Sequence, residues 1–300
     1  MDIINEEYKE DENDYEAGKI NIRISKTKKD FENFDIDKLL DFKEKGRKIN
    51  EYYGIYKIQM LIASGSGGGK TTFAINNILN GIIPSKIILL FCPFETYTSG
   101  FWYNIIHHLD GLNEKYNLDL KLIIFDISRG NNFTSFDDYM NYGEGVLYKG
   151  FPTLNKLIEF RNSYLKKSKD NNSWLLIFDD FVNNFNSSNW EEYYRYVHNI
   201  SRMNGNMMSL VQSITSIPPQ VRSSYTIIVL FTNYLADSVT KSLIKNCWVN
   251  NLTSEQINEL LRLTKMAKGD QKHIPLILIG STAPVEKNII YNNKFITFEN

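Results

Sequence analysis

Short apolar runs separated by helical patterns constrain the fold of this 300-residue chain most strongly. The runs are apolar at nearly every position, so a strand formed by one of them is expected to be buried on both faces. Between the runs, apolar residues recur at helical spacing. Buried strands that alternate with helices predict a three-layer α/β fold with a mostly parallel sheet. We expect strands at Ile55–Ala63, Lys86–Cys92, Lys121–Ile127, Trp174–Phe178, Met207–Val211, Thr226–Thr232 and Ile274–Gly280.

Helices are expected between these strands, and one more strand near the C-terminus. Thr253 and Gln256 have the spacing of a capping box, in which each side chain binds the backbone N–H of the other residue. Phe295–Phe298 is expected to pair as an edge strand. The expected helices are Lys70–Leu79 and residues 99–109, 153–167, 189–203 and 254–268.

Charge is spread unevenly, although the net charge is only -1. Residues 1–20 carry eight acidic and two basic side chains, whereas residues 21–50 carry six acidic and nine basic ones. We expect a disordered acidic arm at residues 1–20, an N-terminal extension at 21–52 and one folded domain at 53–300. The balanced charge excludes a globally basic nucleic-acid binder but allows a basic patch.

The two cysteines, Cys92 and Cys247, lie far apart and lack CxxC spacing. We expect two reduced thiols in a cytosol-like compartment, with one disulfide as the alternative. No apolar run approaches the roughly 18 residues that a membrane-spanning helix needs. The N-terminus is acidic, unlike a signal peptide. We therefore expect a soluble, intracellular protein without a membrane segment.

The segment Ser64–Thr71, with the sequence SGSGGGKT, carries the strongest chemical signal. It lies between an expected strand and an expected helix, which is the setting of a phosphate-binding P-loop. Its glycines allow backbone N–H groups to turn inward around a β-phosphate, and the helix N-terminus adds positive potential there. Lys70 then reaches the β- and γ-phosphates of ATP, and the Thr71 hydroxyl binds Mg²⁺.

The P-loop pattern GxxxxGK[ST] begins with glycine, where this chain has Ser64. That position makes the bend from strand to loop, and other small residues can replace glycine there. Because the rest of the pattern fits, we assign residues 53–300 to a P-loop ATPase domain. The residues expected to bind the nucleotide are Ser64, Gly65, Ser66, Gly67, Gly68, Gly69, Lys70, Thr71 and Thr72.

A P-loop site also needs a carboxylate at the end of a nearby strand. Asp179 and Asp180 follow the apolar run Trp174–Phe178, and ligands of open α/β sheets bind at the carboxyl ends of strands. We assign Asp179 to Mg²⁺ and Asp180 to polarising the attacking water, a role that Glu often has. Asp is shorter than Glu, which leaves a water relay or slow hydrolysis open. Asp126 is the competing candidate for the Mg²⁺ carboxylate.

Further polar residues follow Asp180 along the chain. Gln212 ends the next expected strand, where it can contact the γ-phosphate or orient water. Arg202 precedes that strand, and Ile217–Ser224, with the sequence IPPQVRSS, follows it. With the P-loop and the acidic strand, this order resembles the FtsK–HerA superfamily, and in particular the genome-packaging ATPases of large eukaryotic DNA viruses and virophages. The resemblance spans about Met60–Phe231, and the departures are Met203 where the family often has His, and Val221 in place of Ile.

The resemblance implies a RecA-like sheet and a homo-oligomeric ring, a pentamer or hexamer, around double-stranded DNA. In such rings an arginine of the neighbouring subunit completes ATP hydrolysis by neutralising charge on the transferred phosphoryl group. Arg202 and Arg222 are the two candidates, with Arg202 preferred. A viral capsid or portal protein is the implied partner, and the host-cell cytoplasm, the virus factory and the virion are the implied locations.

Basic residues gather in the C-terminal part of the chain, and two interpretations of them stay open. They either contact DNA phosphates in the pore of a ring or form a solvated helix face. Three rival functions also stay open: a non-packaging motor of the same superfamily, an ATP-binding regulatory switch with little turnover, and a small-molecule kinase. The basic residues are Lys241, Lys245, Arg262, Lys265, Lys268 and Lys272.

Overall fold

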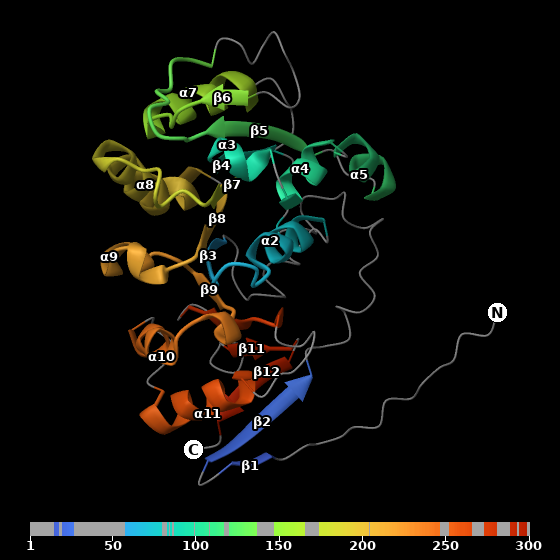
Figure 1. The fold of residues 1–300 in the computed structure, drawn as a ribbon, viewed down its shortest axis with the longest axis vertical. Coiled ribbons are helices and arrows are strands. Elements are labelled where there is room, and N and C mark those ends of the chain that lie inside the picture. The colour runs from blue at the N-terminus through green and yellow to red at the C-terminus, as the bar shows by residue number, and fades with distance from the viewer. Residues whose placement is uncertain are drawn as a thin grey trace, which may run out of the picture.

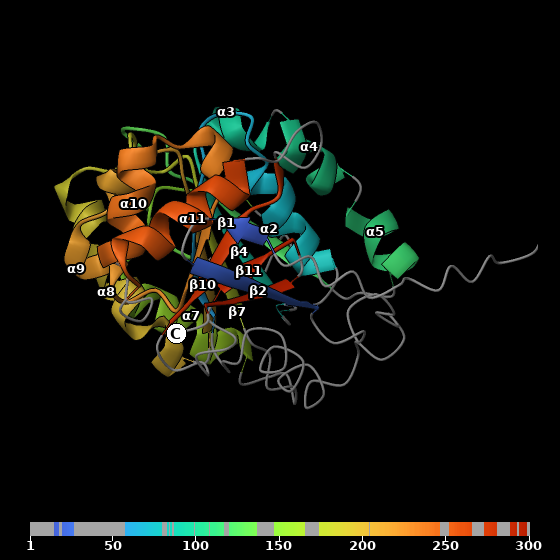
Figure 2. The ribbon, with the colours of Figure 1, turned by 90° about the horizontal axis from the view of Figure 1, so that it is seen from below.

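The chain folds into one sheet with helices on both of its faces (Figures 1 and 2). Within the described residues the sheet has 12 strands in the order β1-β2-β12-β11-β10-β9-β3-β8-β7-β4-β5-β6. The expected three-layer α/β fold is therefore confirmed. The computed structural model describes residues 15–17, 20–26, 58–79, 83, 85, 87–98, 100–107, 109–116, 120–136, 147–165, 174–203, 205–246, 252–265, 273–280, 289–292 and 294–298.

The half of the sheet that runs from β9 to β6 is parallel throughout. Every residue of β3, β4, β7, β8 and β9 is buried, as the apolar runs predict for strands covered on both faces. The carboxyl ends of these strands meet at one edge, which is the edge of the functional site. The parallel strands are β9 (Ile227–Leu230), β3 (Gln59–Ala63), β8 (Gly205–Val211), β7 (Trp174–Asp179), β4 (Ile87–Cys92), β5 (Lys121–Asp126) and β6 (Leu147–Lys149).

The other half of the sheet is antiparallel, and it corrects two expectations. The strand expected at the sheet edge near the C-terminus, β12, lies inside the sheet, because β2 from the N-terminal segment pairs with its free side. Tyr15–Ala17, expected within the disordered arm, form β1 and pair with β2. The domain boundaries at residues 20 and 52 stay predictions. These strands are β10 (Leu276–Ile279), β11 (Ile289–Tyr291), β12 (Lys294–Phe298), β2 (Ile20–Lys26) and β1 (Tyr15–Ala17).

Two sets of helices cover the two faces of the sheet (Figures 1 and 2). One set, α2 (Lys70–Leu79), α4 (Gly100–His107) and α5 (Leu109–Tyr116), packs on the cluster that contains Met60, Ile62 and Leu90. The opposite face carries the second set. That set comprises α7 (Leu154–Leu165), α8 (Ser187–Asn199), α9 (Pro219–Arg222), α10 (Asp237–Asn246) and α11 (Ser254–Lys265).

Several helix boundaries agree with the sequence pattern, and one does not. The helix after the P-loop spans Lys70–Leu79 as expected. The capping box of α11 is confirmed, because Gln256 N donates to Thr253 Oγ1 at 3.2 Å and Thr253 N donates to Gln256 Oε1 at 2.9 Å. The helix expected over residues 99–109 ends at His107, and α5 begins at Leu109. The short helices are α3 (Phe94–Tyr97), η3 (Ile200–Met203), η4 (Ile214–Ser216) and η5 (Thr232–Tyr234).

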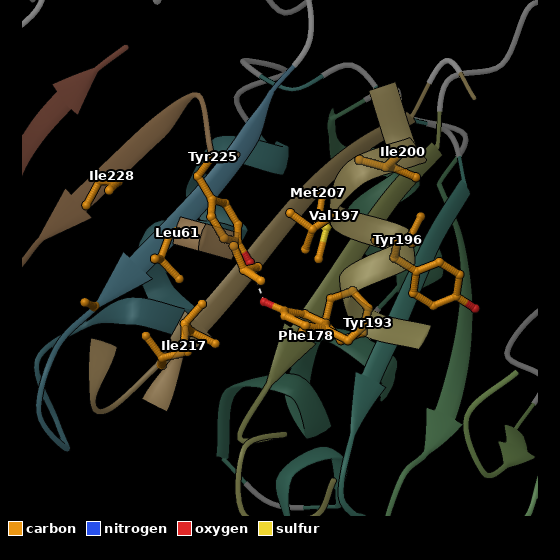
Figure 3. Packing of buried hydrophobic residues seen from close by; sticks show 14 of the residues in the cluster. Leu61, Phe178, Tyr193, Tyr196, Val197, Ile200, Met207, Ile217, Tyr225 and Ile228 are labelled. Atoms are coloured by element: carbon orange, nitrogen blue, oxygen red, sulfur yellow. Dashed lines mark hydrogen bonds between the residues drawn. The ribbon is translucent and has the colours of Figure 1, made fainter. Parts of the chain in front are cut away.

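Aromatic side chains pack the face of the sheet below α8. Phe178 of β7 stacks on Phe91 with ring centroids 4.6 Å apart and meets Tyr193 edge-on at 5.1 Å. Figure 3 shows Tyr193 pointing from α8 toward Tyr225, to which its hydroxyl is hydrogen-bonded. The two hydroxyls also lie 3.0 Å and 2.9 Å from Ser209 Oγ, so the three hydroxyls form a ring in which each donates one hydrogen bond. This network satisfies the buried polar atoms and fixes β8 between α8 and the segment before β9.

Replacing Phe178 with alanine is expected to lower the free energy of unfolding by about 3–5 kcal/mol, since the vacated ring space lies among side chains that collapse only partly. Urea denaturation followed by circular dichroism measures the change. Phe94→Ala is the control, because Phe94 is 53% exposed and its loss should change the value by less than about 0.5 kcal/mol. Equal effects of the two substitutions would contradict the packing described for Phe178.

Candidate active site

The loop from Ser64 to Gly69 joins the carboxyl end of β3 to the first residue of α2, Lys70. Gly67 and Gly69 adopt φ values of 71° and 100°, in the region that only glycine enters without strain. Gly68 N donates to Gly65 O at 3.3 Å, which closes the turn. The loop therefore curls back over the amino end of α2, as a phosphate-binding loop requires.

The packing of the loop explains the serine at its first position. A Cβ on Gly68 would lie 1.7 Å from Ser64 Oγ, so the hydroxyl fills the space beside that glycine. A Cβ on Gly65 would lie 2.8 Å from the carbonyl oxygen of Tyr234, which also accepts from Gly65 N at 3.2 Å. Ser64 is fully buried. Serine at position 64 therefore fits into the loop, because residue 68 is glycine and has no Cβ that would collide with the Ser64 hydroxyl.

The side chain of Lys70 is buried inside the loop. Its Nζ donates to Ser64 O at 3.1 Å and to Gly65 O at 3.4 Å. Burial lowers the pKa of Lys70, and the nearby charges of Asp179 and Asp180 act in the opposite direction. A partly desolvated ammonium beside a glycine loop attracts the phosphates of a nucleotide strongly.

Asp179 ends β7 and lies against the start of α2. Its Oδ2 accepts from Thr71 Oγ1 at 3.0 Å and from Trp102 Nε1 at 2.8 Å. The residue is 2% exposed, and burial raises the pKa of its carboxyl to about 6, with a further upward effect from the charge of Asp180. The bonds from Trp102 and Thr71 and the charge of Lys70 work against that rise. The structure thus gathers a buried carboxylate, a hydroxyl and an indole N–H at one point.

Asp180 follows in a left-handed conformation with φ of 51°, which non-glycine residues adopt only at a cost. That turn directs its exposed carboxylate toward two polar side chains. Gln212 Nε2 donates to Oδ1 and Thr96 Oγ1 donates to Oδ2, each at 3.3 Å. Gln212, which follows the carboxyl end of β8, is therefore in contact with Asp180.

The order of strands explains why these groups meet. β8, which leads into Gln212, lies between the P-loop strand β3 and the acidic strand β7. All three strands are parallel and end at the same edge. Gln212 is thereby placed between Lys70 and Asp180 although the three residues come from distant parts of the chain.

The donor set fits a magnesium nucleotide. Thr71 Oγ1 and Asp179 Oδ2 are neighbouring oxygen atoms, and Mg²⁺ prefers oxygen ligands. The loop also fits a phosphate group, since the positive φ angles of two glycines and the absence of a Cβ on Gly68 form the curl that faces the first turn of α2. Thr72 lies in that first turn with Lys70 and Thr71, and Ser66 is exposed at the tip of the loop.

The competing carboxylate, Asp126, is engaged elsewhere. Its Oδ1 accepts from Ser128 N at 3.0 Å and from Ser128 Oγ at 2.6 Å, so it caps the turn after β5. β4 separates β5 from β7. Asp179, rather than Asp126, is therefore the carboxylate that meets Thr71.

The two candidate arginines do not join this cluster within one chain. Arg202 directly precedes β8 in η3, at the edge opposite to the P-loop. Arg222 ends α9, in the connection that returns the chain to the amino end of β9. Among the described residues, no hydrogen bond or ion pair joins either guanidinium to Asp179 or Asp180. Their expected role in a neighbouring subunit stays a prediction.

Part of the basic group near the C-terminus is paired with acidic residues. Arg262 Nε lies 2.9 Å from Glu259 Oε2, and Lys265 pairs with Asp237. Lys241 and Lys245 are exposed on α10. Lys268, Lys272 and Cys247 lie outside the described residues, and Cys92 is a buried free thiol.

Trp102, Thr96 and Tyr234 were not expected at the site from the sequence. Trp102 belongs to an aromatic-rich helix whose sequence indicates only hydrophobic-core residues. Its indole N–H reaches Asp179 because α4 packs beside β7. Thr96 and Tyr234 lie on short helical turns at the ends of β4 and β9. A polar or aromatic residue just after an expected strand is the signal that could have found these two.

The sequence matches no described protein family and no curated protein. The structure is similar to that of the genome packaging NTPase B204 from Sulfolobus turreted icosahedral virus 2 in complex with ATPγS, at 14% identity and a TM-score of 0.46, over 78% of this chain and 96% of that one. A second similar structure is B204, the DNA-packaging ATPase from Sulfolobus turreted icosahedral virus, at 13% identity and a TM-score of 0.41, over 80% and 96% of the two chains.

In the part of the chain that the structure describes, no helix is long and apolar enough to cross a membrane.

Asp179→Asn is expected to stabilise the protein at neutral pH in the absence of metal. The pKa of Asp179 in the folded state, about 6, lies above its ordinary 3.8, so folding favours the protonated carboxyl. The contribution of the protonated Asp179 carboxyl to the free energy of unfolding is therefore complete below pH 3.8 and is lost as the pH rises through 6. Asparagine keeps the oxygen that accepts from Thr71 and Trp102 but has no charge to bury. The difference in unfolding free energy should approach about 3 kcal/mol at pH 7.5.

Thermal unfolding in EDTA between pH 4.5 and pH 8 measures this effect. The melting temperatures of the two proteins should separate as the pH rises. A constant difference across this range would contradict the assigned burial of the Asp179 charge.

Gly68→Ala is expected to weaken ATP binding, since the new Cβ would collide with Ser64 Oγ and distort the loop. Overpacking of this kind costs about 1–3 kcal/mol. The double variant Ser64→Gly, Gly68→Ala should recover part of the loss, because the nearest remaining contact, Tyr234 Cγ at 3.0 Å, is less severe. Calorimetric titration with ATPγS measures both variants, and equal binding by the single and double variants would contradict the role given to the Ser64 hydroxyl.

Proposed function

We propose that this protein is an ATP-driven double-stranded DNA translocase that packages a viral genome into a capsid. The observation that carries the ATPase part is the meeting of Thr71, Asp179, Asp180 and Gln212 beside Lys70 at one edge of the sheet. Phosphoryl transfer to water uses these groups: a phosphate-binding loop, a hydroxyl and a buried carboxylate for the metal ion, and a second carboxylate for the water.

The phosphates of ATP are held by the loop. Residues Ser64–Gly69 offer backbone N–H groups, Lys70 supplies the positive charge, and the first turn of α2 adds the partial charge of its free N–H groups. The ammonium of Lys70 is kept inside the loop by the carbonyl groups of Ser64 and Gly65. It is therefore positioned before the nucleotide arrives, and little side-chain entropy is lost on binding.

Mg²⁺ is held by Thr71 and Asp179. The ion neutralises charge on the β- and γ-phosphates during transfer. Trp102 keeps the Asp179 carboxylate in one orientation through a bond of 2.8 Å. Burial raises the pKa of this carboxyl to about 6 and the charge of Lys70 acts against that rise, so at neutral pH the ionised form is available to bind a cation.

Asp180 and Gln212 act on the attacking water. The Asp180 carboxylate is exposed at the edge of the sheet and is held from two sides by Thr96 and Gln212. It accepts a proton from the water, while the Gln212 amide contacts the γ-phosphate or the water. The short Asp side chain makes a water relay part of this proposal.

The step from ATP hydrolysis to DNA packaging rests on the ordered sequence motifs, above all Gln212 followed by IPPQVR. The placement of Arg202 and Arg222 away from the P-loop of their own chain supports action on a neighbouring subunit. We therefore propose a homo-oligomeric ring, a pentamer or hexamer, around double-stranded DNA, with a capsid or portal protein as its partner. The host-cell cytoplasm, the virus factory and the virion are the proposed locations.

Steady-state ATP hydrolysis with and without linear duplex DNA tests this function. DNA is expected to raise the rate, and Lys70→Ala is expected to abolish hydrolysis in both conditions, since the variant lacks the charge on the β- and γ-phosphates. Lys149→Ala is a matched control, because Lys149 is exposed on β6 and its loss should leave the basal rate and its response to DNA unchanged.

ATP binding without turnover at any DNA concentration, under conditions where rings form, would exclude the motor and favour an ATP-binding regulatory switch. Turnover that DNA does not change would leave an ATPase but contradict coupling to DNA.

A further inference from the structure

An aromatic pair beside the P-loop has no part in the chemistry described above. The rings of Tyr234 and His273 stack with centroids 5.4 Å apart and an interplanar angle of 30°. The Tyr234 hydroxyl lies 3.1 Å from His273 Nδ1 and 3.2 Å from Nε2. His273 is exposed and Tyr234 is only half-buried, so the pair is open to solvent rather than enclosed in the core.

The pair is joined rigidly to the loop. The backbone oxygen of Tyr234 accepts from Gly65 N at 3.2 Å. The Tyr234 ring lies against Gly68, since a Cβ on that glycine would meet Tyr234 Cγ at 3.0 Å. Tyr234 also packs on the cluster of buried residues that contains Ala74 and Ile75 of α2. The aromatic ring thus has a fixed position relative to any bound phosphate.

Sheet topology places the pair at the functional edge. Tyr234 ends η5, just after the carboxyl end of β9, and His273 lies just before the amino end of β10. β10 runs antiparallel to β9, so these two ends meet at the same edge of the sheet. That edge is the one that holds the P-loop, because β9 is parallel to β3.

The direction of the bound nucleotide follows from the neighbours of β3. Asp179, Asp180 and Gln212 lie on the side of β8 and β7, so the γ-phosphate points to that side. β9 flanks β3 on the other side. The nucleoside end of the triphosphate therefore extends toward β9, where Tyr234 and His273 lie.

We propose that Tyr234 and His273 form a stacking platform for the base of the nucleotide. This inference rests on the proposed function, because it needs a nucleoside triphosphate in the P-loop. A flat aromatic surface recognises the π-face of a base and strengthens binding without contacting the phosphates. The platform thus provides the part of the affinity that distinguishes a nucleoside triphosphate from its bare triphosphate chain.

The test compares the binding of ATP and of inorganic tripolyphosphate, both with Mg²⁺, by calorimetric titration of the full chain. Tyr234→Leu removes the ring but keeps an apolar side chain against α2. It is expected to weaken ATP binding by about 5- to 150-fold, the range of a lost base–aromatic stack, and to change tripolyphosphate binding by less than about twofold. His273→Ala should also weaken ATP binding without weakening tripolyphosphate binding. Tyr234→Phe, which keeps the ring, should bind ATP nearly as the unaltered protein does.

Tyr194→Leu is the matched control, since Tyr194 is a half-buried tyrosine on α8, and it should bind both ligands normally. Unchanged ATP binding by Tyr234→Leu, or equal weakening of ATP and tripolyphosphate, would overturn the platform while leaving the proposed function intact. Failure of the unaltered protein to bind either ligand would overturn the proposed function and the platform together.

Discussion

The buried carboxylate of Asp179 is the point on which the site depends. Oδ2 of this residue receives the hydroxyl of Thr71 from α2 and the indole N–H of Trp102 from α4, so three elements meet at one atom. Burial of the charge is unfavourable, and the raised pKa of the carboxyl expresses that cost. In the proposed function, this buried charge and the charge of Lys70 beside it would bind the cation and the phosphates of ATP.

The position of β8 determines the second half of the site. This strand separates the P-loop strand from the acidic strand and ends at Gln212, which reaches Asp180. At mid-strand, the Ser209 hydroxyl is hydrogen-bonded to the hydroxyls of Tyr193 and Tyr225, which belong to α8 and to the segment before β9. In the proposed function, β8 would therefore connect ATP hydrolysis at its carboxyl end with the segments that carry Arg202 and Arg222.

In the proposed function, the two flanks of the P-loop would bind different parts of the nucleotide. Charged and polar groups lie on the side of β7 and β8, where the terminal phosphate and the metal ion would bind. An aromatic pair lies on the side of β9 and β10, where no charge is needed. Gly65 and Gly68 both lie against Tyr234, so the glycine loop packs on the side of β9 and β10 and faces the side of β7 and β8.

Local sequence determined the elements, and tertiary structure determined their neighbours. The apolar runs, the glycine loop and the capping box of α11 were predictable because burial on both faces, positive φ angles and helix capping each depend on a few adjacent residues. The cluster of Lys70, Asp179 and Gln212 was predictable in part, since parallel strands end at a common edge. The pairing of β2 with β12, the contact of Trp102 with Asp179 and the stacking of Tyr234 on His273 join segments far apart in the chain. Such contacts arise from the packing of whole elements, which no local pattern encodes, so only the tertiary structure decided them.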